Sequence, residues 1–262
     1  MSVILKTQNL GINFGGLVAL EDLNLCLEKG EILGIVGPNG AGKTTVLNLI
    51  TGVYRPTFGH ILFKDHQIDG LPPHVIASLG ISRTFQNIRL IPYLSVLENI
   101  MLGMALRIKE SPLDAVLLTK KTRSERIKWI SHAEEIITFL GLSKVAEVDA
   151  TDLPYGKQRA VEIARAIATG AQVLLLDEPG AGMSTQEKED LAKIIRDLRS
   201  QMQKSIILIE HDMKMVLNLV DRVVVLDFGR QIAEGPPDTI KSNPQVIEAY
   251  LGRVEAVANA GS

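Results

Sequence analysis

The stretch of sequence that decides the fold is a glycine-rich loop, Gly37-Pro38-Asn39-Gly40-Ala41-Gly42-Lys43-Thr44, followed by Thr45. It matches the pattern G-x-x-x-x-G-K-[ST], in which the glycines let the backbone curl so that its N–H groups point at phosphate oxygens. The apolar run 32–36 before the loop predicts a buried strand, and residues 44–50 after it predict a helix whose N-terminal dipole favours an anion. We expect Lys43 to reach the β- and γ-phosphates and the Thr44 hydroxyl to coordinate Mg²⁺. The loop therefore predicts a site for a nucleoside triphosphate.

A second motif lies further along the chain, where four apolar residues, 173–176, are followed by Asp177 and Glu178. The apolar run predicts a central strand, and its C-terminal end is the edge at which open α/β sheets bind ligands. We expect Asp177 to hold Mg²⁺, directly or through water, and Glu178 to orient or deprotonate the attacking water. Together with the glycine-rich loop, this motif predicts an ATPase or a GTPase.

The composition limits the number of domains, the partners and the compartment that we expect for this chain. The 262 residues are 46% hydrophobic and 22% charged, which suits one α/β domain, with or without an inserted subdomain. The net charge of −2 argues against nucleic acid as a partner. A single cysteine, Cys26, forms no internal disulfide and suits a reducing compartment. We find neither a signal peptide nor about 18 consecutive apolar residues, so we expect the chain to reach a membrane only by docking on a protein that spans it.

The pattern along the chain predicts how this domain is divided. Residues 3–35 read as short β segments, whereas residues 88–168 show helical periodicity, which predicts a helical insertion. The α/β pattern returns at Val173, and Ser184 and Glu187 have capping-box spacing at the start of a helix. Asp227 to Arg230 predict a hairpin turn, and a last helix is expected at about 244–251.

The segment before the acidic strand points to a family. It reads Leu153-Pro154-Tyr155-Gly156-Lys157-Gln158-Arg159 and resembles the signature motif of the ATP-binding cassette (ABC) ATPases. With Gln86 in Arg83–Asn87 and His211 in Ile209–Asp212, five motifs stand in the family's order, and the resemblance covers residues 3–252. It implies a P-loop α/β core with an antiparallel β subdomain and an inserted α-helical subdomain. One domain would span residues 1–252, with the insert at about 88–168 and a flexible tail at 253–262.

The resemblance implies a role for each motif. ABC ATPases work as head-to-tail dimers, in which each ATP lies between the P-loop of one subunit and the signature residues of the other, here Leu153, Pro154, Tyr155, Gly156, Lys157 and Gln158. Glu178 would be the catalytic base, and His211 would contact the γ-phosphate. Gln86 would sense Mg²⁺ and link the site to the membrane partner. Phe14 would stack on adenine, although it could also simply cap the β subdomain. Gly180–Ser184 would touch the opposite subunit.

Pro154 departs from the family signature, which usually has serine at this place. Proline lacks the hydroxyl that would reach the γ-phosphate, and it has no N–H. Losing a hydrogen bond to a charged phosphate costs about 1.5–3 kcal/mol. Since the signature faces the partner's ATP, we hypothesise an asymmetric heterodimer in which the site built on Lys43 and Glu178 keeps full activity; a homodimer would be weakened at both sites.

Several segments resemble the branched-chain amino acid (Liv-type) importers in particular, namely Phe14–Gly16, Arg83–Asn87, Leu153–Arg159, Glu210–Met213 and Ile247–Gly252. This implies a peripheral subunit on the cytoplasmic face of the membrane, with a second ATPase subunit, two permease subunits and, indirectly, a periplasmic or extracellular binding protein. Ile88, Leu90, Ile91, Tyr93 and Leu94 form a candidate docking patch for the permease, with local core packing as the alternative. Other open alternatives are urea or amide uptake, lipopolysaccharide export, a soluble ABC ATPase and, least favoured, a GTPase, because we find no N-K-x-D motif.

Overall fold

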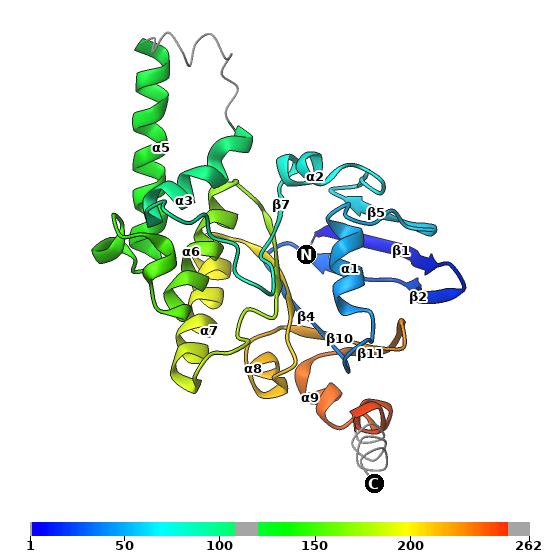
Figure 1. Cartoon of the computed structure of the whole chain (residues 1–262). Helices are drawn as coiled ribbons and strands as arrows, with labels where there is room; N and C mark the ends of the chain where they lie inside the picture. The colour runs from blue at the N-terminus through cyan, green and yellow to red at the C-terminus, as the bar shows by residue number, and fades with distance from the viewer. Residues whose placement is uncertain (1, 108–119, 251–262) are drawn as a thin grey trace.

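The computed structural model describes residues 2–107 and 120–250, with 106–107 and 120–125 described as backbone only. Two sheets organise this part of the chain, and a group of helices lies on the side away from the antiparallel sheet (Figure 1). The proposed tail at 253–262 and the end of the last predicted helix lie outside the described residues. The backbone is helical from 244 to 250. Within the described ranges, none of the helices has the length and apolar character needed to cross a bilayer.

The larger sheet is six-stranded and carries the predicted central strands. Its spatial order is β11 (Arg230–Gly235), β10 (Arg222–Asp227), β4 (Ile32–Val36), β9 (Ser205–Ile209), β8 (Val173–Asp177) and β7 (Ile81–Arg83). All neighbours are parallel except the β10–β11 hairpin, whose turn the sequence predicted. Every residue of β4, β8 and β9 is buried, as expected for parallel strands covered on both faces.

Alternate residues of these strands enter two different cores, because successive side chains of a strand point to opposite faces. On one face, Leu33 and Leu175 pack with α1 (Lys43–Ile50) and with the antiparallel sheet. On the other face, Ile32 and Leu174 pack with the remaining large helices. The glycine-rich loop leaves the sheet at the end of β4, next to the ends of β8 and β9.

The antiparallel sheet corrects the expectation of short β segments at 3–35. Strand β1 runs for 12 residues, Val3–Phe14, and pairs with β2 (Leu17–Leu23), β3 (Cys26–Glu28) and β5 (Phe58–Phe63), while β6 (His66–Gln67) pairs with β5. Register shifts interrupt the pairing of β1, and Asn9 has φ +47°. Such bulges break the alternation of buried and exposed residues, which hides a long strand in the sequence. Cys26 begins β3 and is exposed.

The helical part contains α3 (Val96–Gly103), α5 (Lys120–Phe139) and α6 (Tyr155–Ala168), with short 3₁₀ turns η1 (Met104–Arg107), η2 (Ser143–Val145) and η3 (Ala150–Asp152). Helices α3 and α6 are in close contact, since a Cβ at Gly103 would lie 2.2 Å from the carbonyl oxygen of Arg165. A capping box of Ser95 and Glu98 begins α3. The proposed helical insert would be built from these elements.

Further helices complete the described part of the fold. Helix α7 (Thr185–Ser200) begins at the predicted capping box of Ser184 and Glu187. Helix α8 (Met213–Leu217) follows β9, and α9 (Pro237–Lys241) follows β11. The sequence pattern does not predict α2 (Pro73–Leu79) or β7, because both are too short to show a clear periodicity.

Candidate nucleotide-binding site

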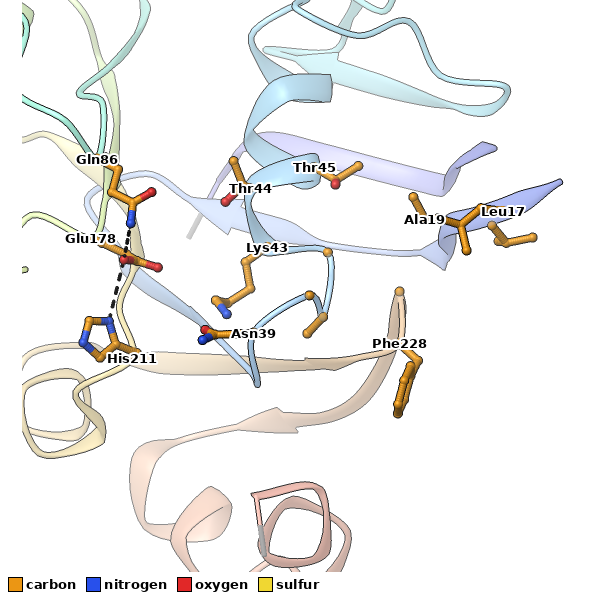
Figure 2. Close-up of a pocket in the computed structure, with 15 residues that line it drawn as sticks. Leu17, Ala19, Asn39, Lys43, Thr44, Thr45, Gln86, Glu178, His211 and Phe228 are labelled. Carbon is orange, nitrogen blue, oxygen red and sulfur yellow. Dashed lines mark hydrogen bonds and ion pairs between the residues drawn. The ribbon is translucent and has the colours of Figure 1, made fainter. Parts of the chain in front are cut away.

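A pocket of about 830 Å³ lies where the glycine-rich loop meets the ends of the parallel strands (Figure 2). Half of the predicted site residues line it: Asn39, Gly40, Ala41, Gly42, Lys43, Thr44, Thr45, Gln86, Glu178 and His211. Its other end is lined by Leu17, Val18, Ala19, Phe228 and Gly229. The pocket therefore has a polar end at the strand tips and a more apolar end, an arrangement that suits a ligand with a charged part and an aromatic part.

The glycine-rich loop has a backbone conformation that only glycine adopts without strain at two of its positions. Gly42 has φ +101°, and a Cβ at Gly37 would lie 2.1 Å from the carbonyl oxygen of Leu226. Gly42 is also the N-cap of α1 and has no side chain to cap the first amides. Lys43, Thr44 and Thr45 at the start of α1 line the pocket, where the positive end of the helix dipole favours an anion. The Lys43 ammonium is buried and donates to the carbonyl oxygens of Gly37, at 2.7 Å, and Pro38, at 3.0 Å.

Three side chains from different elements meet at the polar end. Gln86, which follows β7, donates from Nε2 to Oε2 of Glu178 over 3.0 Å, and Nδ1 of His211 lies 3.7 Å from the same oxygen (Figure 2). Glu178 follows β8 and has φ +46°, a left-handed conformation that is unfavourable for a residue with a side chain. Its amide donates to the carbonyl of Ile209 over 2.9 Å, which fixes the turn against the end of β9. The structure thus brings together the three residues that the sequence predicted at this end.

Glu210, between β9 and His211, is a residue of the site to which the sequence pattern assigns no role. Its side chain is 1% exposed and accepts a hydrogen bond from the amide of Gly180 over 2.6 Å. Burial raises the pKa of Glu210, and the Gly180 hydrogen bond and the nearby His211 oppose this shift. Glu210 therefore holds the loop after Glu178 against the loop that carries His211. The signal in the sequence was an acidic residue next to a histidine at the end of an apolar strand.

Asp177 lies behind the pocket rather than in its wall. Its side chain is 4% exposed, and its Oδ2 accepts from Nη2 of Arg83 over 2.7 Å, while Nη1 of Arg83 donates to Asn48 on α1 over 2.6 Å. Arg83 thus ties together β7, β8 and the helix that follows the loop. The oxygen donors of this region, which are the Thr44 hydroxyl, the Gln86 amide and the Asp177 carboxylate, are the hard ligands that suit Mg²⁺. With Arg83 on one carboxylate oxygen, contact through water fits Asp177 better than direct coordination.

Phe14 does not line the pocket. It ends β1 and packs edge-on against Tyr54, with ring centroids 5.2 Å apart and an interplanar angle of 74°. Its role in stacking on adenine stays a prediction. The exposed apolar side chains in the pocket wall are instead Leu17, Val18 and Phe228, of which Phe228 is 76% exposed. Phe228 lies at the tip of the β10–β11 hairpin, a place that short-range sequence patterns do not connect with the glycine-rich loop.

The signature residues Leu153–Gln158 lie apart from this pocket, at the start of α6. Pro154 is the N-cap, with φ −53° and ψ 147°, and its carbonyl accepts from the amides of Lys157 and Gln158. Gln158 folds back and donates to the carbonyls of Thr151 and Leu153. A separation from the chain's own pocket is what a role toward a second subunit requires.

The strand–loop–helix unit, the parallel sheet and the acidic strand end define the class of the protein, a P-loop nucleotide-binding domain. Comparison with known proteins gives the family. The family profile described as "ABC transporter" matches residues 20–181, and the one described as "Branched-chain amino acid ATP-binding cassette transporter" matches residues 230–256. The chain belongs to the ABC transporter family, in the group of branched-chain amino acid transport ATP-binding proteins.

Relatives and solved structures agree. The chain is 41% identical to the high-affinity branched-chain amino acid transport ATP-binding protein LivG of Escherichia coli K12 over 95% of this chain and 98% of that protein. It is also 41% identical to BraF of Pseudomonas aeruginosa, with the same coverage. A crystal structure of an ABC transporter cassette in its ADP conformation superposes with a TM-score of 0.83, at 32% identity, over 96% of this chain and all of that chain. These matches confirm the predicted fold and family.

Proposed function

We propose that this chain binds and hydrolyses ATP to power the import of branched-chain amino acids. The observation that carries the proposal is the convergence of Lys43, Gln86, Glu178 and His211 on one pocket. The amino acid is suggested by relatives named as branched-chain amino acid transport proteins. No feature of the chain favours urea or lipopolysaccharide transport over this reading.

The pocket supports a specific division of roles. The loop amides and Lys43 would bind the triphosphate, and Glu178 would be the base that activates water, held in place by Gln86. His211 would contact the γ-phosphate beside this carboxylate. Thr44, Gln86 and, through water, Asp177 would hold Mg²⁺, which when bound neutralises charge on the phosphates. Phe14, or the apolar wall of Leu17, Val18 and Phe228, would contact adenine.

The site would be completed by a second ATPase subunit. The signature residues Leu153–Gln158 lie at the exposed start of α6, away from the chain's own pocket, so they would close the pocket of a partner. A hydroxyl is missing at Pro154, which supports a heterodimer in which the partner supplies an intact signature to Lys43 and Glu178.

The permease would dock on the patch that follows Gln86. Tyr93 is 92% exposed and Ile91 is 46% exposed, whereas Leu90 packs partly against the core. Tyr93 also lines a pocket of about 480 Å³ with Leu97 and Met101. An exposed aromatic residue beside a hollow is a typical anchor point in protein interfaces. The subunit would thus sit at the cytoplasmic face of the membrane, on two permease subunits, with the binding protein on the opposite face.

The test is purification of the assembled complex followed by an ATPase assay. We expect the chain to co-purify with two hydrophobic permease subunits and to hydrolyse ATP. Addition of the binding protein with leucine, isoleucine or valine should raise the rate, whereas urea should not. Purification as a soluble protein without permeases, or a rate that ignores all three amino acids, would contradict the proposed transport role.

A further inference from the structure

Helix α6, which begins with the signature residues, also holds the loop that carries Gln86. Arg159, one turn into the helix, is fully buried, with 0% of its surface exposed. Its Nη1 donates to the carbonyl oxygen of Phe85 over 2.7 Å, and its Nη2 donates to the carbonyl oxygen of Gln86 over 2.8 Å. One guanidinium therefore fixes two successive carbonyls of the Gln86 loop, each through a different nitrogen of its planar, rigid fork.

Glu162 closes the same arrangement from the next turn of α6. Its Oε2 accepts from Nη1 of Arg159 over 2.6 Å, and its Oε1 accepts from the amide of Phe85 over 3.2 Å. The side chain is 2% exposed, and burial raises the pKa of Glu162 although Arg159 opposes the shift. A buried ion pair is weak support for stability in itself, because desolvation offsets much of its attraction. Its defined geometry on both sides of Phe85 indicates a role in fixing this loop.

The held loop leads directly to the proposed base. Gln86, whose carbonyl Arg159 holds, donates from its side chain to Oε2 of Glu178 over 3.0 Å. On the other side, the hydroxyl of Tyr155 lies 3.2 Å from Nη2 of Arg159. Tyr155 is a signature residue and is 41% exposed. A continuous series of hydrogen bonds thus runs from the signature surface through Arg159 and the Gln86 backbone to Glu178.

We propose that Arg159, paired with Glu162, is a positioning residue for ATP hydrolysis, which aims Gln86 at Glu178 and joins it to the signature surface through Tyr155. The inference rests on the proposed function and deepens it. A signature that closes on the nucleotide of a partner would act through this contact on the chain's own Gln86. The two nucleotide sites of a dimer would then be coupled through buried side chains of α6.

The test is a double-mutant cycle between Arg159 and Gln86 in the assembled transporter. We expect Arg159→Lys to lower kcat by about tenfold, the loss that follows when a hydrogen bond to a charged group is weakened, with KM for ATP within about twofold. In the Gln86→Ala background, Arg159→Lys should change kcat by less than about twofold, because Arg159 acts through Gln86. Equal losses in both backgrounds would overturn the proposal and leave Arg159 a structural role only.

Two further variants separate positioning from folding. Arg159→Met with Glu162→Met removes both charges together, so we expect a folded protein with low kcat; wild-type kcat in that folded variant would also overturn the proposal. Tyr155→Phe removes one hydroxyl, and we expect it to reduce the cooperativity of ATP hydrolysis; unchanged cooperativity would exclude the link to the signature surface.

The matched control is Arg222→Lys. Arg222 makes the same kind of contacts at the opposite ends of the strands, with Glu31 over 2.9 Å and with the carbonyl of Cys26. We expect it to lower Tm without a loss of kcat. A wild-type complex without ATPase activity would refute the proposed function, whereas an active wild type with an equally active Arg159→Lys variant would refute only this inference.

Discussion

Replacement of Glu178 by glutamine is the sharpest perturbation of the site, because it removes a charge and a proton acceptor but keeps the shape. Oε2 of Glu178 accepts from Gln86 over 3.0 Å, and the glutamine carbonyl can accept the same bond. His211 Nδ1 lies 3.7 Å from that same oxygen, beyond hydrogen-bond distance, so the substitution breaks no hydrogen bond to His211. We therefore expect the loops, the stability and the affinity for ATP to change little.

The rate should nevertheless fall strongly. A positioned general base contributes about 10²–10⁴-fold, which corresponds to about 3–5 kcal/mol in the barrier at about 1.4 kcal/mol per factor of ten. The assay is steady-state ATP hydrolysis by the assembled transporter, with Glu189→Gln, an exposed acid on α7, as the control that should keep full activity. ATP should remain bound and stabilise the dimer, which sedimentation can follow. A Glu178→Gln variant that keeps more than about a tenth of wild-type kcat would refute the role of Glu178 as base.

Three other changes test separate parts of the account. Pro154→Ser should raise the ATPase rate of the assembled heterodimer by up to about twofold, because it restores a hydroxyl to the partner's phosphate while the site built on Lys43 is already fully active; an unchanged rate would show that the missing hydroxyl does not limit hydrolysis. Glu210→Gln should raise Tm more at pH 8 than at pH 5. The raised pKa of Glu210 means that its contribution to stability is present at low pH and is lost as the pH rises through that pKa, so a pH-independent difference in Tm would contradict the burial argument. Gly103→Ala should destabilise the protein by about 1–3 kcal/mol in urea unfolding, since its Cβ would lie 2.2 Å from the Arg165 carbonyl; wild-type stability would show that α3 can move away from α6.

The parts of the fold that the sequence predicted are those with strong local patterns. The uniform burial of β8 and the capping box of Ser184 and Glu187 both follow from residues close together in the chain. The convergence of Lys43 and Glu178 was predictable because loops at the carboxyl ends of parallel strands share one edge of the sheet.

The features that the sequence did not predict depend on long-range packing. Strand β7 has only three residues and is recognisable by its pairing with β8. The Arg83–Asp177 pair joins residues 94 positions apart, and the Arg159–Gln86 contact joins residues 73 positions apart. Nothing in a local pattern distinguishes these arginines from the solvated ones on the surface. The position of Phe228 also depends on long-range packing. It lines the pocket because the hairpin turn lies against the glycine-rich loop.

Titration of the assembled wild-type protein and its Lys43→Ala variant with a fluorescent ATP analogue in the presence of Mg²⁺ tests the central claim most directly. Wild type should show saturable binding. The variant should bind at least about tenfold more weakly, because it loses the buried ammonium that is proposed to bind the phosphates. Equal affinity of the two proteins would contradict the placement of the triphosphate in this pocket.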